Sequence, residues 1–107
     1  MEENFDTLFA KIRSFGWDNN KRNRVLRERK IDFEEVRFIF DEPTIAYRSD
    51  RKGEMRYIVF GLLDGKEIAV VCTFRDDICW IISARRASRN ERKKYHDRLP
   101  RRSAPEG

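Results

Sequence analysis

Apolar residues recur at helical spacing in the first part of the chain and alternate with polar residues in the later part. The first stripe predicts an amphipathic helix over residues 4–13, because its members fall mostly three or four positions apart. They are Phe5, Leu8, Phe9, Ile12 and Phe15. Such a stripe can pack on a sheet or contact a partner, and we favour packing because small domains seldom leave so many phenylalanines in water.

Two further helices are predicted before the chain becomes strand-like. Asp18 can cap a helix over residues 19–30, which is so rich in Lys and Arg that most of it must be exposed. Asp32 can cap the next helix, with Glu35 at the capping-box position, and Pro43 ends it. The buried face of this helix is expected to contain Phe33, Val36, Ile39 and Phe40. The preceding Phe15-Gly16-Trp17 predicts a short strand or a turn.

Three segments with period-two alternation follow, at residues 55–63, 67–75 and 78–84. Asp64-Gly65 is a strong hairpin signal between the first two, and Asp76-Asp77 marks the second turn. Residues 44–55 begin as a possible edge strand and become a polar loop. The pattern predicts an α+β domain whose small antiparallel sheet is a meander of three main strands, with helices packed on one face.

The two turns set a register that assigns each strand residue to one of two faces. One face is apolar over its middle and is expected to hold the helices; it comprises Tyr57, Val59, Val70, Cys72, Phe74, Cys79, Ile81, Ser83 and Arg85. The other face ends in a polar and aromatic cluster of Arg56, Thr73, Arg75 and Trp80. That cluster is either a seat for a phosphate and a stacked base or a partly solvated sheet face.

A last helix signal coincides with a concentration of positive charge. Ser88 with Glu91 three residues later forms a capping-box pattern, which places Arg85 and Arg86 at a strand-to-helix junction. Residues 85–102 hold nine Lys or Arg against two acidic residues, a balance of +7 in a chain whose net charge is +5. Such a patch favours a polyanionic partner, although a solvated helix face gives the same pattern.

Composition narrows the class of protein further. The 107 residues are 39% hydrophobic and 40% charged with eight Phe, which suits one small globular domain. No apolar run approaches 18 residues and the chain starts with acidic residues, so we expect no membrane partner and a cytoplasmic location. The two cysteines lack CxxC spacing and there is one histidine, so we expect reduced core thiols and no metal or cofactor.

Motifs spread over residues 15–96 resemble those of the BrnT toxins in collinear order. The matching segments are Phe15-Gly16-Trp17-Asp18-Asn19-Asn20-Lys21, Ile31-Asp32-Phe33-Glu34-Glu35-Val36, Phe40-Asp41-Glu42-Pro43, Arg56-Tyr57-Ile58-Val59-Phe60-Gly61, the strand 70–74, and Ile82-Ser83-Ala84-Arg85-Arg86-Ala87 with Glu91-Arg92 and Tyr95. We therefore expect a single domain over residues 1–107. It would have an N-terminal helical extension at 1–13, a BrnT-like core at 15–96 and a flexible basic tail at 97–107.

The resemblance implies a RelE-like fold and a metal-free endoribonuclease toxin that inhibits translation, acting on mRNA that is free or associated with the ribosome. It also implies a cognate ribbon-helix-helix antitoxin, through which the toxin would reach operator DNA and repress its operon. Family members usually carry Lys-His-Gly where this chain has Glu28-Arg29-Lys30, and Asn at the position of Val25. These departures leave a second interpretation, a catalytically inactive RNA-binding or co-repressor module.

Metal-free RNA cleavage needs cations around the reacting phosphate and a group that moves protons. Arginine suits the first task because it is always charged and can donate two parallel hydrogen bonds to a phosphate. We expect a catalytic set of Lys21, Arg56, Arg75, Arg85 and Tyr95. We expect an RNA-binding set of Arg29, Thr73, Trp80, Arg86 and Arg92. Arginine is a poor base, so the proton carrier would be Lys21, Tyr57, Tyr95 or His96.

Overall fold

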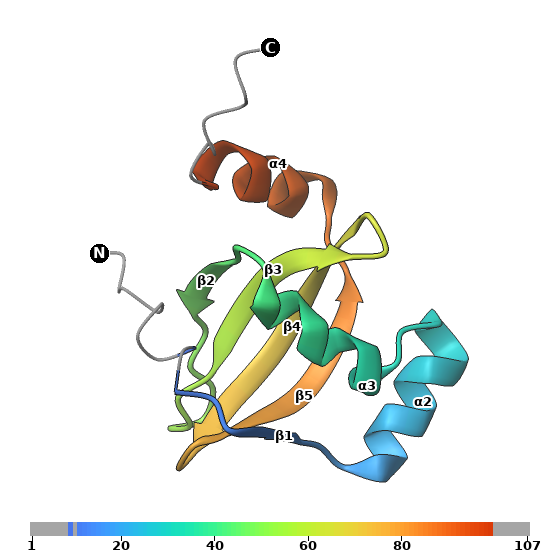
Figure 1. Ribbon diagram of the computed structural model, residues 1–107, viewed down its shortest axis with the longest axis vertical. Helices are drawn as coiled ribbons and strands as arrows, with labels where there is room; N and C mark the ends of the chain where they lie inside the picture. The colour runs from blue at the N-terminus through green and yellow to red at the C-terminus, as the bar shows by residue number, and fades with distance from the viewer. Residues whose placement is uncertain (1–8, 10, 100–107) are drawn as a thin grey trace.

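The computed structural model describes residue 9 and residues 11–99, which form a five-stranded sheet with helices against both faces (Figure 1). In chain order the elements are β1 (Ser14–Gly16), α2 (Asn19–Arg29), α3 (Phe33–Val36), the 3-10 helix η1 (Arg37–Asp41), β2 (Ile45–Arg48), β3 (Tyr57–Leu63), β4 (Lys66–Arg75), β5 (Ile78–Arg86) and α4 (Arg89–Arg98). None of the helices described is long and apolar enough to cross a membrane.

Both predicted ends of the chain fall largely outside the described residues. The helix expected over residues 4–13 is described only at residue 9 and residues 11–13, and residues 11–13 are not helical. Phe9 and Ile12 do pack against the core, as the packing alternative predicts for them. The basic tail expected from residue 97 lies outside the described part from residue 100 onward.

The sheet has two edge strands besides the three main strands that the alternation predicts. Its strand order is β1-β5-β4-β3-β2, with β1 parallel to β5 and all other neighbours antiparallel. Both predicted hairpin turns occur, and Asp64 and Asp76 take positive φ angles of 52° and 57° there. Aspartate tolerates this backbone conformation better than most residues do, which is why it marks turns.

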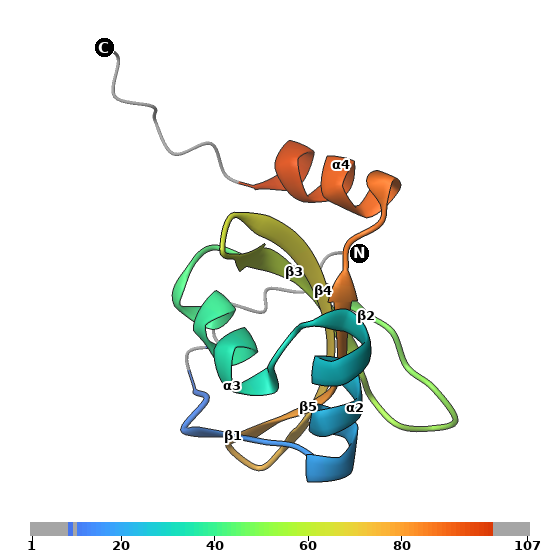
Figure 2. The same ribbon diagram turned by 90° about the vertical axis from the view of Figure 1, so that its right-hand side faces the viewer.

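Helix α3 and η1 cover the apolar face of the sheet, and α2 runs along the edge of β5 (Figure 2). The Asp32 carboxylate caps α3 by accepting the Glu34 backbone N–H at 3.0 Å. Phe33, Val36 and Ile39 are at most 1% exposed. They belong to the core that contains Val59, Val70, Cys72, Cys79 and Ile81. The helix-covered face therefore agrees with the prediction over the middle of each strand.

Two details of the core depend on small side chains. A Cβ atom at Gly61 would lie 3.0 Å from the Ile39 Cβ, so glycine allows η1 to approach β3 closely. Cys72 and Cys79 are buried and free, as predicted. Hydrogen bonding to Cys79 and burial raise the pKa of the Cys72 thiol, which keeps it protonated.

A β-bulge in β5 changes the faces predicted for the end of that strand. Strands β4 and β5 pair at Cys72↔Ile81 and next at Val71↔Ser83, so Ile82 is an extra residue without a partner in β4. A bulge shifts the alternation for every residue that follows it. The assignment of Ser83 and Arg85 to the helix-covered face is therefore wrong. Both lie on the opposite face, which we call the open face.

Helix α4 packs over one end of the open face, which corrects the expectation that the helices share one side. Tyr95 is 2% exposed and packs with Phe60 and Ala69. This second cluster is bordered by Ile45, Tyr47, Ile58 and Leu99. Helix α4 thus divides the open face into a covered half near the β3–β4 hairpin and an uncovered half near the β4–β5 turn.

Candidate active site

The uncovered half of the open face holds a pocket of about 290 Å³, which we call the open-face pocket. Its floor is formed by Val71 and by the bulge residues Ile82 and Ser83. Around the floor stand Lys21, Arg51, Arg56 and Ser49. Its lining residues include three cations and no carboxylate, so the pocket suits an anion.

Lys21 reaches the pocket because α2 continues along the edge of β5 beyond the short strand β1. The helix begins at Asp18, whose carboxylate accepts the Asn20 backbone N–H at 2.9 Å. Val25, 2% exposed, anchors the helix in the core. The sequence motif that contains Lys21 therefore positions this residue through a cap on one side and a buried valine on the other.

Arg29 ties the far end of α2 to the same strand. Its guanidinium donates to the Ala84 carbonyl at 2.9 Å and to Ser83 Oγ at 3.2 Å. The first bond satisfies a carbonyl on the β5 edge that β1 is too short to reach. Arg29, expected to bind RNA, thus has a structural role and also contacts the pocket floor.

The β2–β3 connection, predicted as a polar loop, is a tight turn that supplies two of the pocket cations. Arg51 and Glu54 exchange backbone hydrogen bonds of 3.0 and 2.9 Å, and Lys52 and Gly53 between them have φ angles of 50° and 80°. Two consecutive positive φ angles are typical of a type I′ turn. Arg56 Nε donates to Glu54 Oε1 at 2.7 Å, which fixes the guanidinium beside the pocket. Sequence reasoning missed Arg51 and Glu54 because Lys-Gly is a weaker turn signal than Asp-Gly.

Thr73, Arg75 and Trp80 lie nearer the β4–β5 turn and do not line the open-face pocket. Thr73 is buried, and its hydroxyl donates to the Met55 carbonyl at 2.7 Å, so it holds the segment that precedes β3. The Arg75 guanidinium lies 4.6 Å from the centre of the Trp80 ring. Gly16 of β1 makes room for this ring, because a Cβ atom there would lie 2.7 Å from Trp80 Cε3. The predicted patch is therefore a cation stacked on an indole beside the pocket.

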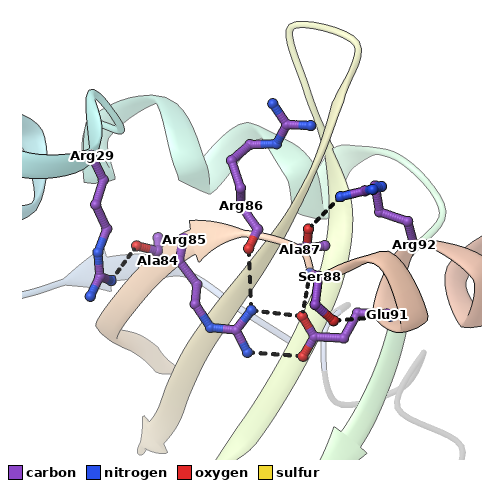
Figure 3. A network of polar contacts seen from close by, with 8 residues as sticks. All are labelled: Arg29, Ala84, Arg85, Arg86, Ala87, Ser88, Glu91 and Arg92. Carbon is purple, nitrogen blue, oxygen red and sulfur yellow. Dashed lines mark hydrogen bonds and ion pairs between the residues drawn. The ribbon is translucent and has the colours of Figure 1, made fainter.

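Arg85 is engaged at the N-terminus of α4 (Figure 3). Its two terminal nitrogens donate to the two carboxylate oxygens of Glu91 at 2.6 and 2.9 Å. Glu91 also accepts the Ser88 N–H at 2.8 Å, while Ser88 Oγ accepts the Glu91 N–H at 3.2 Å, which confirms the predicted capping box. The Arg85 guanidinium lowers the pKa of Glu91 to about 2. A phosphate would reach Arg85 only in competition with Glu91.

The other two arginines of this junction differ in availability. Arg92 donates to the Ala87 carbonyl at 2.9 Å. The Arg86 side chain points away from the Arg85–Glu91 pair in Figure 3 and forms no ion pair within residues 11–99. Arg86 is therefore free to bind a ligand without losing a contact.

Of the four predicted proton carriers, Lys21 is the one that lines the open-face pocket. Tyr57 is 6% exposed on the helix-covered face. Tyr95, on the face of α4 that packs on the sheet, is 2% exposed and burial raises its pKa, so the expected catalytic role of Tyr95 does not fit its position. His96 lies 2.5 Å from Glu67, which stands four residues along β4 from the pocket floor, or about 13 Å.

The described part of the chain contains no group of three His, Cys, Asp or Glu side chains placed to hold a metal ion. What it does contain is a set of arginine and lysine side chains around one concave surface. Fold and pocket together define a small α+β protein with a cationic pocket on one face of its sheet.

Comparison with known proteins identifies the family within this class. Residues 17–91 match the family described as the ribonuclease toxin BrnT of type II toxin–antitoxin systems, and the chain belongs to this family. Among solved structures, the 1.1 Å crystal structure of the Brucella abortus ribonuclease toxin BrnT matches with a TM-score of 0.54 and 25% sequence identity. The match covers 71% of this chain and 97% of that chain. No curated protein matches the sequence.

Proposed function

We propose that this protein is a cytoplasmic endoribonuclease that needs no metal ion and inhibits translation by cutting mRNA, either free or on the ribosome. The observation that carries the proposal is the open-face pocket, where Lys21, Arg51 and Arg56 surround one site. Fixed cations at a reacting phosphate can supply the charge stabilisation that metal ions supply in other nucleases. Family membership supports RNA as the substrate class and an antitoxin as the partner.

In the proposed reaction, the 2′-hydroxyl oxygen of the RNA attacks the adjacent phosphorus, and the bond from phosphorus to the 5′-oxygen breaks. The products are a cyclic phosphate and a free 5′-hydroxyl, and a proton passes from the first oxygen to the second. Arg56, held by Glu54, and Arg51 stabilise the extra negative charge of the phosphorane. Protonated Lys21 gives its proton to the departing 5′-oxygen and is reprotonated with the proton that the 2′-hydroxyl loses.

The residues around the pocket are proposed to hold the rest of the substrate. The Arg75–Trp80 pair offers an aromatic surface on which a base next to the cut can stack. Arg85 joins the site where a phosphate displaces Glu91, and Arg92 adds positive charge at the same junction. Thr73 acts through the backbone that it holds in place.

Removing one positive charge from the pocket tests the proposal. Lys21→Gln and Arg56→Gln are each expected to lower RNA cleavage roughly 10²–10³-fold, the usual effect of losing one fixed donor to a transition state. Arg37→Gln is the matched control, because this substitution removes the same charge from a residue that pairs with Glu34 on the helix-covered side. Wild-type cleavage should persist in excess EDTA. Full activity in both variants, or loss of activity in EDTA, would overturn the proposal.

The antitoxin is proposed to be a ribbon-helix-helix protein through which the complex binds operator DNA and represses its operon. An acidic segment of it would cover Arg85, Arg86 and Arg92 and so mask the substrate. Arg86→Glu tests this surface without breaking the Arg85–Glu91 pair. Antitoxin affinity should fall roughly tenfold relative to Arg37→Glu. Equal affinity of the two variants in a pull-down would show that the antitoxin docks elsewhere.

A second candidate function is a non-catalytic RNA-binding or co-repressor module. The observation that favours it is Arg29, which is already bonded to Ser83 and Ala84 at a position where the family resemblance implies His. An arginine cannot exchange protons near neutral pH. Expression of the protein alone separates the two functions, since an active toxin arrests growth and leaves cut transcripts, whereas a binding module does neither.

A further inference from the structure

A second basic pocket lies between the C-terminus of α2 and the β3–β4 hairpin. It measures about 340 Å³, and we call it the hairpin pocket. Its cations come from different parts of the chain: Arg29, Lys30, Lys66 and Arg86. Its floor is apolar and is formed by Ile31, Leu63 and Ile68, of which Leu63 is partly exposed to the pocket. Asp64 is the one carboxylate among its lining residues.

The rest of the fold does not neutralise these cations. Within residues 11–99, Lys30, Lys66 and Arg86 form no ion pair, and Asp64 forms none with them. Like charges that line one concave surface repel one another, and this repulsion is relieved when an anion binds between them. The hairpin pocket therefore has the electrostatic character of a binding site, although no motif in the sequence marks it.

Arg29 connects the hairpin pocket with the open-face pocket. Its guanidinium lines the first and donates to Ser83 Oγ, and Ser83 lines the floor of the second. A polyanion that leaves the open-face pocket around the edge of β5 meets Arg29 first and then Arg86. The two pockets are thus parts of one cationic path along the end of β5.

We propose that the hairpin pocket is a subsite for the RNA strand that continues beyond the cleaved phosphodiester. A phosphate would bind to its cationic rim and a nucleobase would lie on its apolar floor. The inference rests on the proposed ribonuclease function and deepens it by defining a preferred substrate length. An RNA that spans both pockets would bind more tightly than a short one. Continuity through Arg29 favours RNA over an acidic peptide. An apolar floor beneath a cationic rim also matches a nucleotide, which has a flat apolar nucleobase and a charged phosphate.

The double variant Lys66→Gln/Arg86→Gln removes two charges from the hairpin pocket and leaves the open-face pocket intact. Arg13→Gln/Arg37→Gln is the matched control, since it removes the same charge from exposed residues elsewhere. Binding is measured by fluorescence anisotropy with labelled oligonucleotides, about three and about nine nucleotides long, that carry 2′-O-methyl groups and cannot be cleaved.

The first variant should bind the longer probe about tenfold more weakly than wild type, whereas the control should change its affinity less than about twofold. Both variants should bind the short probe alike. Lys66→Arg/Arg86→Lys, which keeps both charges, should restore most of the affinity for the longer probe.

Any one of the following results would overturn the inference. An equal loss of affinity in the control variant, or an equal loss for both probes, would show that these charges act only through the overall positive charge of the protein. A loss of antitoxin binding with RNA binding intact would assign the pocket to the inhibitor. A variant that still binds the longer probe like wild type, while Lys21→Gln and Arg56→Gln lose cleavage, would leave the proposed function standing without this subsite. A wild-type protein that binds neither probe would contradict both the proposed function and the subsite.

Discussion

Gly16 shows how the space around one residue shapes the open face. A Cβ atom at this position would lie 2.7 and 2.8 Å from two carbons of the Trp80 ring, closer than such atoms approach. Room for such an atom requires the Trp80 ring to shift away from β1, and the Arg75 guanidinium is stacked on that ring. The Phe15-Gly16-Trp17 motif therefore preserves the position of an aromatic ring on β5, which neighbours β1 in the sheet but is distant in sequence.

Gly16→Ala is expected to destabilise the fold by about 1–3 kcal/mol, the usual cost of an atom inserted into a packed site. Urea unfolding measures the loss, and tryptophan fluorescence should shift as the Trp80 ring moves. Ser14→Ala, on the same strand but at an exposed position, is the control and should change neither. A Gly16→Ala protein as stable as the control would show that the ring adapts without cost.

Single residues also show how far the candidate site could be predicted. Lys21 and Arg56, which the family resemblance and phosphate chemistry predict, both line the open-face pocket. Arg51 and Ser83 were missed as pocket residues, since no local pattern indicates that a turn and a bulge bring them together. The capping-box pattern predicts the role of Glu91 at the start of α4, but it does not predict the ion pair of Glu91 with Arg85.

At the level of elements, helix α4 is held to the sheet by a group that titrates. Hydrogen bonds from Arg85 and Ser88 lower the pKa of Glu91 from 4.5 to about 2. A carboxylate whose pKa is lower in the folded state stabilises that state above its ordinary pKa. The stabilisation is lost as the pH falls from about 4.5 toward about 2. Acid should therefore weaken the attachment of α4.

Glu91→Gln is expected to lower the free energy of unfolding by about 1–2 kcal/mol at neutral pH, because a capping bond and an ion pair are weakened together. The variant should also lose the part of the acid dependence between about pH 4.5 and pH 2. Urea unfolding at a series of pH values measures both effects. Glu35→Gln, an exposed position on α3, is the control. Parallel acid curves for Glu91→Gln and wild type would contradict the assignment.

The elements themselves were largely predictable, and their packing was less so. Caps at Asp18, Asp32 and Ser88 and turns at Asp64 and Asp76 are local signals, and the structure confirms each. The bulge after Ile81 was not predictable because it depends on pairing between β4 and β5, and the residues concerned are all compatible with regular strand. The parallel strand β1 is three residues long, too short for a periodic pattern to indicate its partner.

Over the whole molecule, positive charge lines a path from the open-face pocket to the hairpin pocket. Each phosphate that the protein contacts releases condensed counterions from RNA, which makes the affinity fall with salt. RNA affinity should drop by roughly tenfold or more between about 50 and 200 mM salt. A plot of log affinity against log salt measures the slope. An affinity that hardly changes would show that these charges do not contact the RNA backbone.

The bulge at Ile82 has a consequence for how this protein can change. Without Ile82, Ile81 would still face the core and Ser83 the open face, because both keep their partners in β4. Ile82 therefore contributes to the floor of the open-face pocket and belongs to neither hydrophobic cluster. Natural selection can alter activity at this point without rebuilding the scaffold. Deletion of Ile82 is therefore expected to alter the open-face pocket while the pairing of the core residues is kept.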